Sequence, residues 1–481
     1  MRENQMLREP VELLPADQIG PVHFIAIGGA GMSGIAELYH DLGLEVSGSD
    51  QSDSPALRQL GHLGIRTHIG HDPAQLGDAR TVVVSSAIRE SNPELSAARE
   101  RGLRIWHRST ALAALMLGRE AVSIAGTHGK TTTTGMTSVM LTEVGADPSY
   151  VIGSPLASTG KSAHLGSGEA FVVEADESDG TFLQYPTTIA VVTNVEADHL
   201  DNWGTAEAYH AGFTRFATGE HVRAVVLDGD DPVAATLAHQ LRAEGRTVLA
   251  YGEGPECEVR LTELDFEGTT ASATLTHDGW SGRLQLQVPG RYNLGNAAAA
   301  FAVGRLLGHD PEALVRAAGS FTGTLRRFQL VGEVDGVRVF DDYAHHPTEI
   351  RAALTAARKA AGEGRLVACF QPHLFSRTRD FAAEFGQALA LADLVVVTDV
   401  YAAREDPMEG VDGTLVLDAA LAAGADALYV PNKAHLPSAL AELAQPGDLV
   451  MTLGAGDVTL VGPLLVDQLH GRPGEPGAED R

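Results

Sequence analysis

The sequence predicts an α/β fold with three domains. Apolar runs of four to eight residues alternate with Ala- and Leu-rich helical patterns over most of the chain, which is typical of parallel sheets covered by helices. The chain has 481 residues, and an ordinary domain holds about 150. Two glycine-rich turns, each directly after an apolar run, lie in different parts of the chain. Together these features indicate several cores and more than one nucleotide-type loop.

The predicted elements fall into three blocks, with boundaries near residues 115 and 324. In the first block we expect strands at 22–27, 45–49 and 80–85 and a helix at about 33–42. In the second we expect strands at 121–124, 171–173, 189–193, 224–227 and 247–250, followed at 257–288 by a period of two that indicates an antiparallel meander. In the third we expect strands at 337–340, 366–370, 394–398, 427–430 and 448–453 and a helix at 348–361.

The net charge, the number of cysteines and the lack of long apolar stretches exclude several classes of protein. The formal net charge is −28, which argues against a protein that coats nucleic acid or an anionic membrane. Cys257 and Cys369 are the two cysteines, too few for a disulfide framework or a zinc site. The first 20 residues lack the apolar core of a signal peptide, and no apolar stretch approaches the length of about 20 that spans a membrane. We therefore expect a cytoplasmic protein.

The first glycine turn contains Gly29, Gly31 and Gly34 between a predicted strand and a predicted helix. Such a turn lets the backbone approach a diphosphate at a helix N-terminus, and Asp50, after the next strand, can accept a ribose hydroxyl. A nicotinamide or flavin dinucleotide, another diphosphate-containing nucleotide and a merely tight turn all remain compatible with this segment.

The second glycine turn, Gly126-Thr-His-Gly-Lys130-Thr131, predicts a phosphate-binding loop. Its N–H groups would surround phosphate oxygens, Lys130 would lie near the β- and γ-phosphates of a nucleotide, and the Thr131 hydroxyl can bind Mg²⁺. The spacing departs from the general P-loop pattern, because position 124 is Ile rather than Gly.

Two acidic runs follow the predicted strands of the second block. The first is Glu174-Ala-Asp-Glu-Ser-Asp179, and the second is Asn194-Val-Glu-Ala-Asp-His199-Leu-Asp201. Either could be a solvated acidic loop. Behind a Gly-Lys-Thr turn, however, carboxylates and one imidazole at the carboxyl ends of parallel strands favour a magnesium-assisted phosphoryl-transfer site.

These motifs, in this order, resemble the ATP-dependent Mur ligases of peptidoglycan synthesis. The same family pattern includes Tyr292-Asn-Leu-Gly-Asn296 and Asp341-Asp-Tyr-Ala-His345-His-Pro. The resemblance implies a Rossmann-like UDP-sugar-binding domain (1–115), a central P-loop ATPase-like domain that binds ATP (116–324) and a C-terminal Rossmann-like domain that contributes to ATP and amino-acid binding (325–481). It also implies a ligase that joins L-alanine to the lactyl carboxylate of UDP-N-acetylmuramate through an acyl phosphate.

The resemblance further implies a role for particular residues. The residues expected to bind the UDP-sugar are Gly28, Gly29, Ala30, Gly31, Met32, Ser33, Asp50, Ser85 and Ser86. The residues expected to bind ATP are Gly126, Thr127, His128, Gly129, Lys130, Thr131, Thr132, Asn293, Asn296, Arg327 and Asp342. Catalysis would involve Lys130, Glu174 and His199, with Thr131, Glu174 and His199 on the metal and His345, His373 and Arg377 near the amino acid.

The expected cofactor is Mg²⁺ or Mn²⁺, with ATP as co-substrate, and the expected partners are small molecules, with no nucleic acid or membrane and a monomeric or homodimeric chain. Several sibling ligases carry a carbamylated lysine shortly after the metal-binding histidine, whereas residues 211–216 here contain no lysine.

Three competing interpretations remain: a dinucleotide-dependent oxidoreductase, a non-catalytic nucleotide sensor and a recycling ligase that attaches a tripeptide. Asn296 could instead cap a helix, and Tyr343 could pack in a core.

Overall fold

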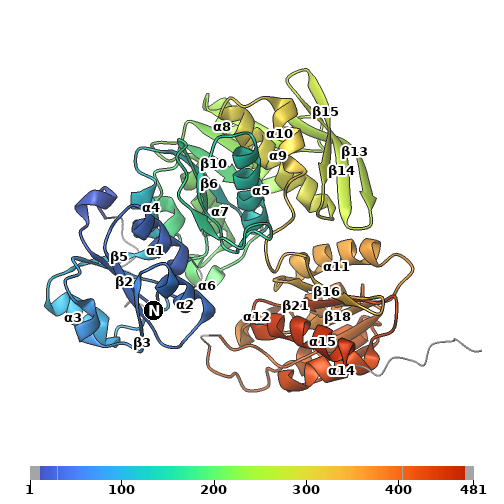
Figure 1. Ribbon diagram of the computed structural model, residues 1–481. Coiled ribbons are helices and arrows are strands. Elements are labelled where there is room, and N and C mark those ends of the chain that lie inside the picture. Colours follow the sequence, from blue (N-terminus) through green and yellow to red (C-terminus); the bar gives the residue numbers. More distant parts are fainter. Residues whose placement is uncertain (1–10, 30, 404, 472–481) are drawn as a thin grey trace, which may run out of the picture. The chain divides into compact units, whose positions relative to one another are not determined.

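The computed structural model describes residues 11–29, 31–403 and 405–471, and Figure 1 shows their arrangement along the chain from blue to red. The chain forms two compact units. One holds the described residues up to Glu263 together with Ala273–Gln285 and Leu294–Thr322, and the other holds Leu264–Ser272, Leu286–Asn293 and the described residues from Gly323 onward. The first unit contains the N-terminal sheet and most of the central sheet, and the second contains the C-terminal sheet and a short part of the central one.

The N-terminal sheet has five parallel strands in the order β3-β2-β1-β4-β5. This order reverses between β1 and β4, and ligands of open α/β sheets bind beside such a reversal, at the carboxyl ends of the strands. The strands are β1 Val22–Ile25, β2 Val46–Asp50, β3 Arg66–Ile69, β4 Thr81–Val84 and β5 Arg104–His107. The helices are α1 Met32–Asp41, α2 Pro55–His62, α3 Pro93–Glu100 and α4 Arg108–Leu115.

The central sheet places β6 between β9 and β10, and both neighbours run parallel to it. The ten strands, in chain order, are Glu120–Ala125, Ser149–Val151, Ala163–His164, Ala170–Glu174, Ile189–Val192, Ala224–Asp228, Thr247–Gly252, Val259–Glu267, Thr270–His277 and Trp280–Leu286 (β6 to β15). The helices are α5 Lys130–Glu143, α6 Leu200–Trp203, α7 Ala206–Ala217, α8 Pro232–Ala243, α9 Arg291–Leu306 and α10 Pro311–Ala318. The segments that follow β6, β9 and β10 therefore leave the sheet at the same edge.

The C-terminal sheet has the order β16-β17-β21-β18-β19-β20, and β16 is antiparallel to β17. Its strands, in chain order, are Gln329–Val334, Val337–Asp342, Leu366–Phe370, Leu394–Val397, Ala427–Tyr429 and Leu449–Leu453 (β16 to β21). Its helices are α11 Pro347–Ala361, α12 Phe375–Leu389, α13 Thr414–Ala422, α14 Leu436–Leu443 and α15 Val461–His470. Figure 1 shows α11 on one side of this sheet and α14 on the other.

Successive strand residues explain these two layers. Along β18, Leu366 and Ala368 belong to the apolar cluster of α11 and α12, whereas Val367 and Cys369 belong to the cluster of α14 and α15. Neighbouring side chains of a strand point to opposite faces. A continuous apolar run is therefore what a sheet covered on both sides requires.

The predicted strands of all three blocks are present, with ends that differ by one or two residues, and so is the helix expected at 348–361. The meander predicted at 257–288 corresponds to β13, β14 and β15, which are neighbours in the sheet and are joined by short turns. The short strands β3, β5, β7, β8 and β16 were not predicted from the sequence. Among the described residues, no helix is long and apolar enough to cross a membrane.

Candidate active site

The P-loop turn connects β6 to α5. Gly126 has φ 138° and Gly129 has φ 83°, backbone conformations that L side chains rarely adopt. A Cβ on Gly126 would lie 2.0 Å from Thr193 Oγ1. The Thr127 hydroxyl donates to the Glu196 carbonyl at 2.8 Å, and the His128 N–H donates to Asn194 Oδ1 at 2.9 Å. The second acidic run therefore fixes the shape of the turn.

Lys130, the first residue of α5, points back over its own turn. Its Nζ donates to the carbonyl oxygens of Gly126 at 2.6 Å and Thr127 at 3.1 Å, and it lies 2.9 Å from Glu177 Oε2. Burial lowers the pKa of Lys130, but the charges of Glu177 and Asp176 outweigh that effect and hold it above its usual value. Lys130 is therefore a charged group held at the P-loop.

Thr131 and Glu174 lie together at the same edge of the central sheet. The Thr131 hydroxyl donates to Glu174 Oε1 at 3.0 Å, and the Gly153 N–H donates to Glu174 Oε2 at 2.7 Å. Thr132 follows in the buried first turn of α5. His199 has φ 54° at the start of α6, and its Nε2 lies 3.6 Å from Asp198 Oδ2 and 3.9 Å from Glu177 Oε1. The Thr131 hydroxyl and the Glu174 carboxylate are oxygen ligands of the kind that suits Mg²⁺.

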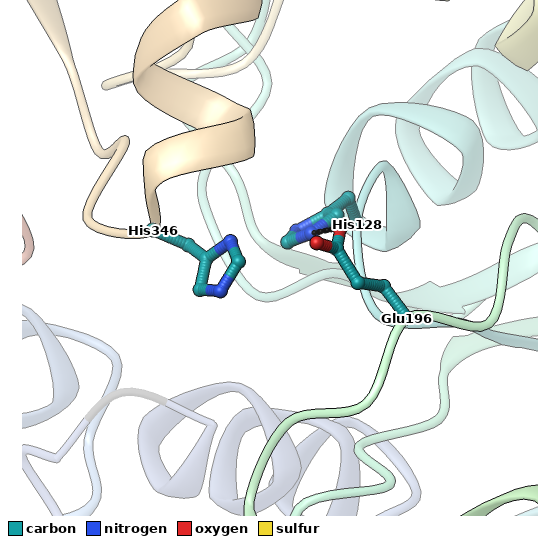
Figure 2. A group of neighbouring side chains, drawn as sticks. All are labelled: His128, Glu196 and His346. Carbon is teal, nitrogen blue, oxygen red and sulfur yellow. Dashed lines mark hydrogen bonds and ion pairs between the residues drawn. The ribbon is translucent and has the colours of Figure 1, made fainter. Parts of the chain in front are cut away.

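His128 lies beside the second acidic run, as Figure 2 shows. Its Nε2 is 3.1 Å from Glu196 Oε2. The figure also draws His346, which in the second unit precedes α11 and whose N–H donates to Glu349 Oε2 at 3.2 Å. The sequence predicted His128 as part of the P-loop, and its pairing with Glu196 ties that loop to the segment after β10.

The N-terminal glycine turn connects β1 to α1. The Gly28 N–H donates to Asp50 Oδ2 at 3.0 Å, so Asp50, expected at a ribose, also holds the turn. Gly31, with φ 77°, is the N-cap of α1, which begins with Met32 and Ser33. The Gly29 carbonyl accepts from the N–H groups of both these residues. Ala30 lies outside the described residues.

Ser85 and Ser86 follow β4, next to β1 in the same sheet. The Ser85 carbonyl accepts from the Ile88 N–H at 3.1 Å. Ser86 Oγ donates to Asp179 Oδ2 at 3.1 Å and lies 3.0 Å from His107 Nε2. Asp179 belongs to the first acidic run, so Ser86 joins the N-terminal sheet to the segment that follows β9.

Asn293 and Asn296 lie in the first turns of α9. The Thr133 hydroxyl donates to Asn296 Oδ1 at 3.0 Å, and Asn296 is only 6 % exposed. Because Asn296 lies inside the helix, it does not cap it. Asn293 Nδ2 donates to the Pro289 carbonyl at 2.6 Å. Thr133 belongs to α5, so Asn296 is fixed against the helix that begins at the P-loop.

In the second unit, Asp342 ends β17. Its carboxylate accepts from the N–H groups of Phe328 and Ala344, both at 2.8 Å, and burial raises its pKa to about 6, while Arg327 opposes the shift. The Arg327 guanidinium lies 5.2 Å from the centre of the Tyr343 ring. Arg326 instead bonds Asp341 and two carbonyl groups. Arg326 therefore joins the segment before β16 to β17 and to the residues after β21.

His345, His373 and Arg377 also come together in the second unit. The ring centres of His345 and His373 are 5.9 Å apart, and His373 stacks on Tyr401 at 5.8 Å. Burial lowers the pKa of His345 to about 3, against the opposing charge of Glu349, and Arg377 and His373 add to the shift. His345 is therefore neutral at neutral pH.

Two side chains of the site were not predicted from the sequence. The acidic run around Glu177 was predicted, but the full burial of this carboxylate against Lys130 was not, because four acids within six residues give no burial signal. The second is Arg108, whose Nη2 lies 2.9 Å from Asp176 Oδ2. Recognising the short strand β5 would have placed Arg108 at a carboxyl end, where ligands bind.

Family models and known relatives match this chain over nearly its whole length. Three family models match: the Mur ligase family catalytic domain at residues 21–120, the Mur ligase middle domain at 124–304 and the Mur ligase glutamate ligase domain at 326–456. The UDP-N-acetylmuramate–L-alanine ligase of Cutibacterium acnes is 68 % identical over 97 % of this chain and 99 % of its own. The protein of that name from Kineococcus radiotolerans is 52 % identical over 95 % and 97 %.

A solved structure gives the same result. The crystal structure of the UDP-N-acetylmuramate–alanine ligase of Thermotoga maritima superposes with a TM-score of 0.80 at 28 % identity and covers 94 % of this chain and 99 % of its own. The predicted α/β fold and the resemblance drawn from the motifs are both confirmed. The chain belongs to the Mur ligase family.

Proposed function

We propose that this Mur ligase joins L-alanine to the lactyl carboxylate of UDP-N-acetylmuramate, with ATP as co-substrate, in the synthesis of a peptidoglycan precursor. The observation that carries the proposal is the P-loop between two acidic runs: Lys130 pairs with Glu177, and Thr131 pairs with Glu174. Relatives that are named for this activity match nearly the whole chain.

The chemistry requires a carboxylate oxygen to become a good leaving group. In the first step, the lactyl carboxylate attacks the γ-phosphorus of ATP, which gives an acyl phosphate and ADP; in the second, the neutral amine of alanine displaces phosphate. Lys130 and the N–H groups of residues 126–132 would bind the phosphate oxygens and stabilise the charge that develops on them. The ligase therefore needs no covalent enzyme intermediate.

Thr131, Glu174 and His199 are the residues we propose for Mg²⁺ or Mn²⁺. The Thr131 hydroxyl and Glu174 Oε1 are 3.0 Å apart, and hydroxyl and carboxylate oxygens are ligands that suit these ions. A bound ion would offset the repulsion between the carboxylate and the phosphates. The chain's own part is to hold Glu174 in place, through the Gly153 N–H.

The remaining assignments follow the predicted motifs. In the first unit we propose that residues 28–33, Asp50, Ser85 and Ser86 bind the UDP-sugar, and that residues 126–132 and Asn296 bind ATP. In the second unit we propose Asn293, Arg327 and Asp342 for ATP and His345, His373 and Arg377 for the amino acid. We keep the domain limits 1–115, 116–324 and 325–481, a cytoplasmic location and a monomer or homodimer as proposals.

The test is phosphate release with UDP-N-acetylmuramate, ATP and Mg²⁺ across a panel of amino acids. We expect L-alanine to be the preferred amine, with glycine excluded by only about 1–3 kcal/mol because it is smaller by one methyl group. A tripeptide as the preferred amine would favour a recycling ligase instead. Chelation of the metal should stop turnover.

Substitution of Lys130 tests the P-loop assignment. Lys130→Ala should abolish phosphate release yet leave affinity for the UDP-sugar largely intact, because Lys130 would contact ATP and not the UDP-sugar. Lys161→Ala removes an exposed lysine of the same domain and should leave turnover unchanged. Normal turnover by Lys130→Ala would refute the assignment.

A further inference from the structure

The Arg108 side chain contacts segments that belong to both sheets of the first unit. It is the first residue of α4, directly after β5 of the N-terminal sheet. Its Nη2 lies 2.9 Å from Oδ2 of Asp176, in the acidic run after β9 of the central sheet. A Cβ built on Gly31 would lie 3.0 Å from Arg108 Nη1. One guanidinium therefore lies against the N-terminal glycine turn and also bonds the acidic run that follows β9.

The surroundings of Arg108 join the two sheets at the edge where their ligands bind. Ser86 Oγ donates to Asp179 Oδ2 at 3.1 Å, and Thr110 Oγ1 donates to Gln184 Oε1 at 3.1 Å. The Arg108 side chain remains 30 % exposed and the Asp176 side chain 40 % exposed. A ligand bound in the glycine turn can therefore reach the guanidinium, and no buried packing has to open for this contact.

The glycine turn needs a cation that its own sequence lacks. Residues 28–33 read Gly-Gly-Ala-Gly-Met-Ser, and the chain has a net charge of −28. Backbone N–H groups and the N-terminus of α1 favour an anion there, but a diphosphate also gains from a planar, two-pronged guanidinium. Arg108 Nη1 is the cationic group that the described structure places beside Gly31.

We propose that Arg108 binds the diphosphate of the sugar nucleotide and, through Asp176, couples the occupancy of that site to nucleotide binding at the P-loop. Asp176 is the link between the two sites: Arg108 bonds its Oδ2, and the next residue, Glu177, lies 2.9 Å from Lys130 Nζ. A diphosphate that draws the guanidinium away from Asp176 leaves the charge of that carboxylate uncompensated beside the P-loop segment, which disfavours the phosphates of ATP. This inference rests on the proposed function.

The test is calorimetric titration with UDP as the probe. Arg108→Met should weaken UDP binding by roughly tenfold or more, because a charge-assisted contact is lost, and Arg108→Lys should lose less, since the charge remains. Asp176→Asn should bind UDP as tightly as the wild type or more tightly, because a competing carboxylate is neutralised. The matched control is Arg99→Met, which removes a surface arginine paired with Glu90 in the same domain.

Coupling is measured as the ratio of ATP affinities with and without saturating UDP-N-acetylmuramate. In the wild type we expect UDP-N-acetylmuramate to lower ATP affinity roughly fivefold or more, because it releases the charge of Asp176, and in Asp176→Asn we expect a ratio near one. A wild type in which UDP-N-acetylmuramate leaves ATP affinity unchanged would overturn the coupling.

The outcomes separate this inference from the proposed function. A wild-type chain that binds neither UDP nor UDP-N-acetylmuramate contradicts the proposed function itself. Arg108→Met could instead bind UDP as tightly as the wild type and differ only in a lower melting temperature. Arg108 would then serve only a structural ion pair with Asp176, and the inference would fail.

Discussion

Asp228, the last residue of β11, has a carboxyl group that is costly to ionise in the folded chain. Burial raises its pKa to about 7, and the charges of Asp230 and Asp231 add to the shift. The unfolded chain releases this proton near pH 4. Between about pH 4 and 7 the folded chain therefore binds more protons than the unfolded chain, and this residue lowers stability as the pH rises.

Asp228→Asn should relieve that cost. The variant keeps an oxygen that can accept from the Asp230 N–H, as Oδ1 does at 2.8 Å, but cannot ionise. We expect its stability relative to the wild type to rise between pH 5 and pH 8, by at most about 1.4 kcal/mol per unit of pKa shift. Urea unfolding at both pH values measures this, with exposed Glu220→Gln as the charge control. An equal stability difference at both pH values would contradict the prediction.

Single residues also show where sequence reasoning stops. Glu174 and Glu177 are both acids of one run, and nothing in the local sequence ranks one above the other. In the structure Glu174 bonds Thr131, whereas Glu177 is buried against Lys130. Which acid enters the core depends on how the chain turns after β9, and no local pattern encodes that turn.

Two glycines flank the helix α5, with similar backbone conformations but different surroundings. Gly129 has φ 83° and Gly145 has φ 81°. A Cβ on Gly129 would lie 2.8 Å from Asn296 Oδ1, whereas a Cβ on Gly145 would meet nothing within 4 Å. Asn296 is buried and holds the Thr133 hydroxyl, so it cannot move without losing that bond.

We therefore expect Gly129→Ala to be more destabilising than Gly145→Ala. The second variant measures backbone strain alone, on the order of 1 kcal/mol. The first adds the displacement of Asn296, which costs about 1–3 kcal/mol more if the Thr133 hydroxyl is left without its acceptor. Urea unfolding compares the two. Equal losses of stability would show that the turn tolerates a side chain at Gly129.

Elements were predictable where the local pattern was long or strongly marked. The glycine turns before α1 and α5 and the apolar strands β18 and β19 stand out because each combines a buried run with a clear break. The strands β3 and β5, each four residues long, contain charged residues such as Arg66 and Arg104. Their pairing in the sheet, rather than their composition, makes them strands, and that pairing is invisible in one sequence.

At the scale of the whole molecule, the apolar cores do not follow the three sequence blocks. Phe24 of β1 and Phe171 of β9 belong to one hydrophobic cluster, although they lie in the N-terminal and central sheets. Phe370 of β18 belongs to a cluster formed entirely by residues of the second unit. Residues that share a core unfold together, so the first two sheets form one cooperative unit.

We therefore predict two unfolding transitions by calorimetry rather than three. Phe24→Ala and Phe171→Ala should lower the same transition, each by about 3–5 kcal/mol of stability, because both remove a buried ring from one cluster. Phe370→Ala should lower the other transition by a similar amount and leave the first unchanged. UDP should raise only the transition that the first two variants lower, since it would bind the first unit. If Phe24→Ala and Phe171→Ala shifted separate transitions, the N-terminal and central sheets would be independent domains, and the contacts between them, Arg108 with Asp176 included, would contribute little to cooperativity.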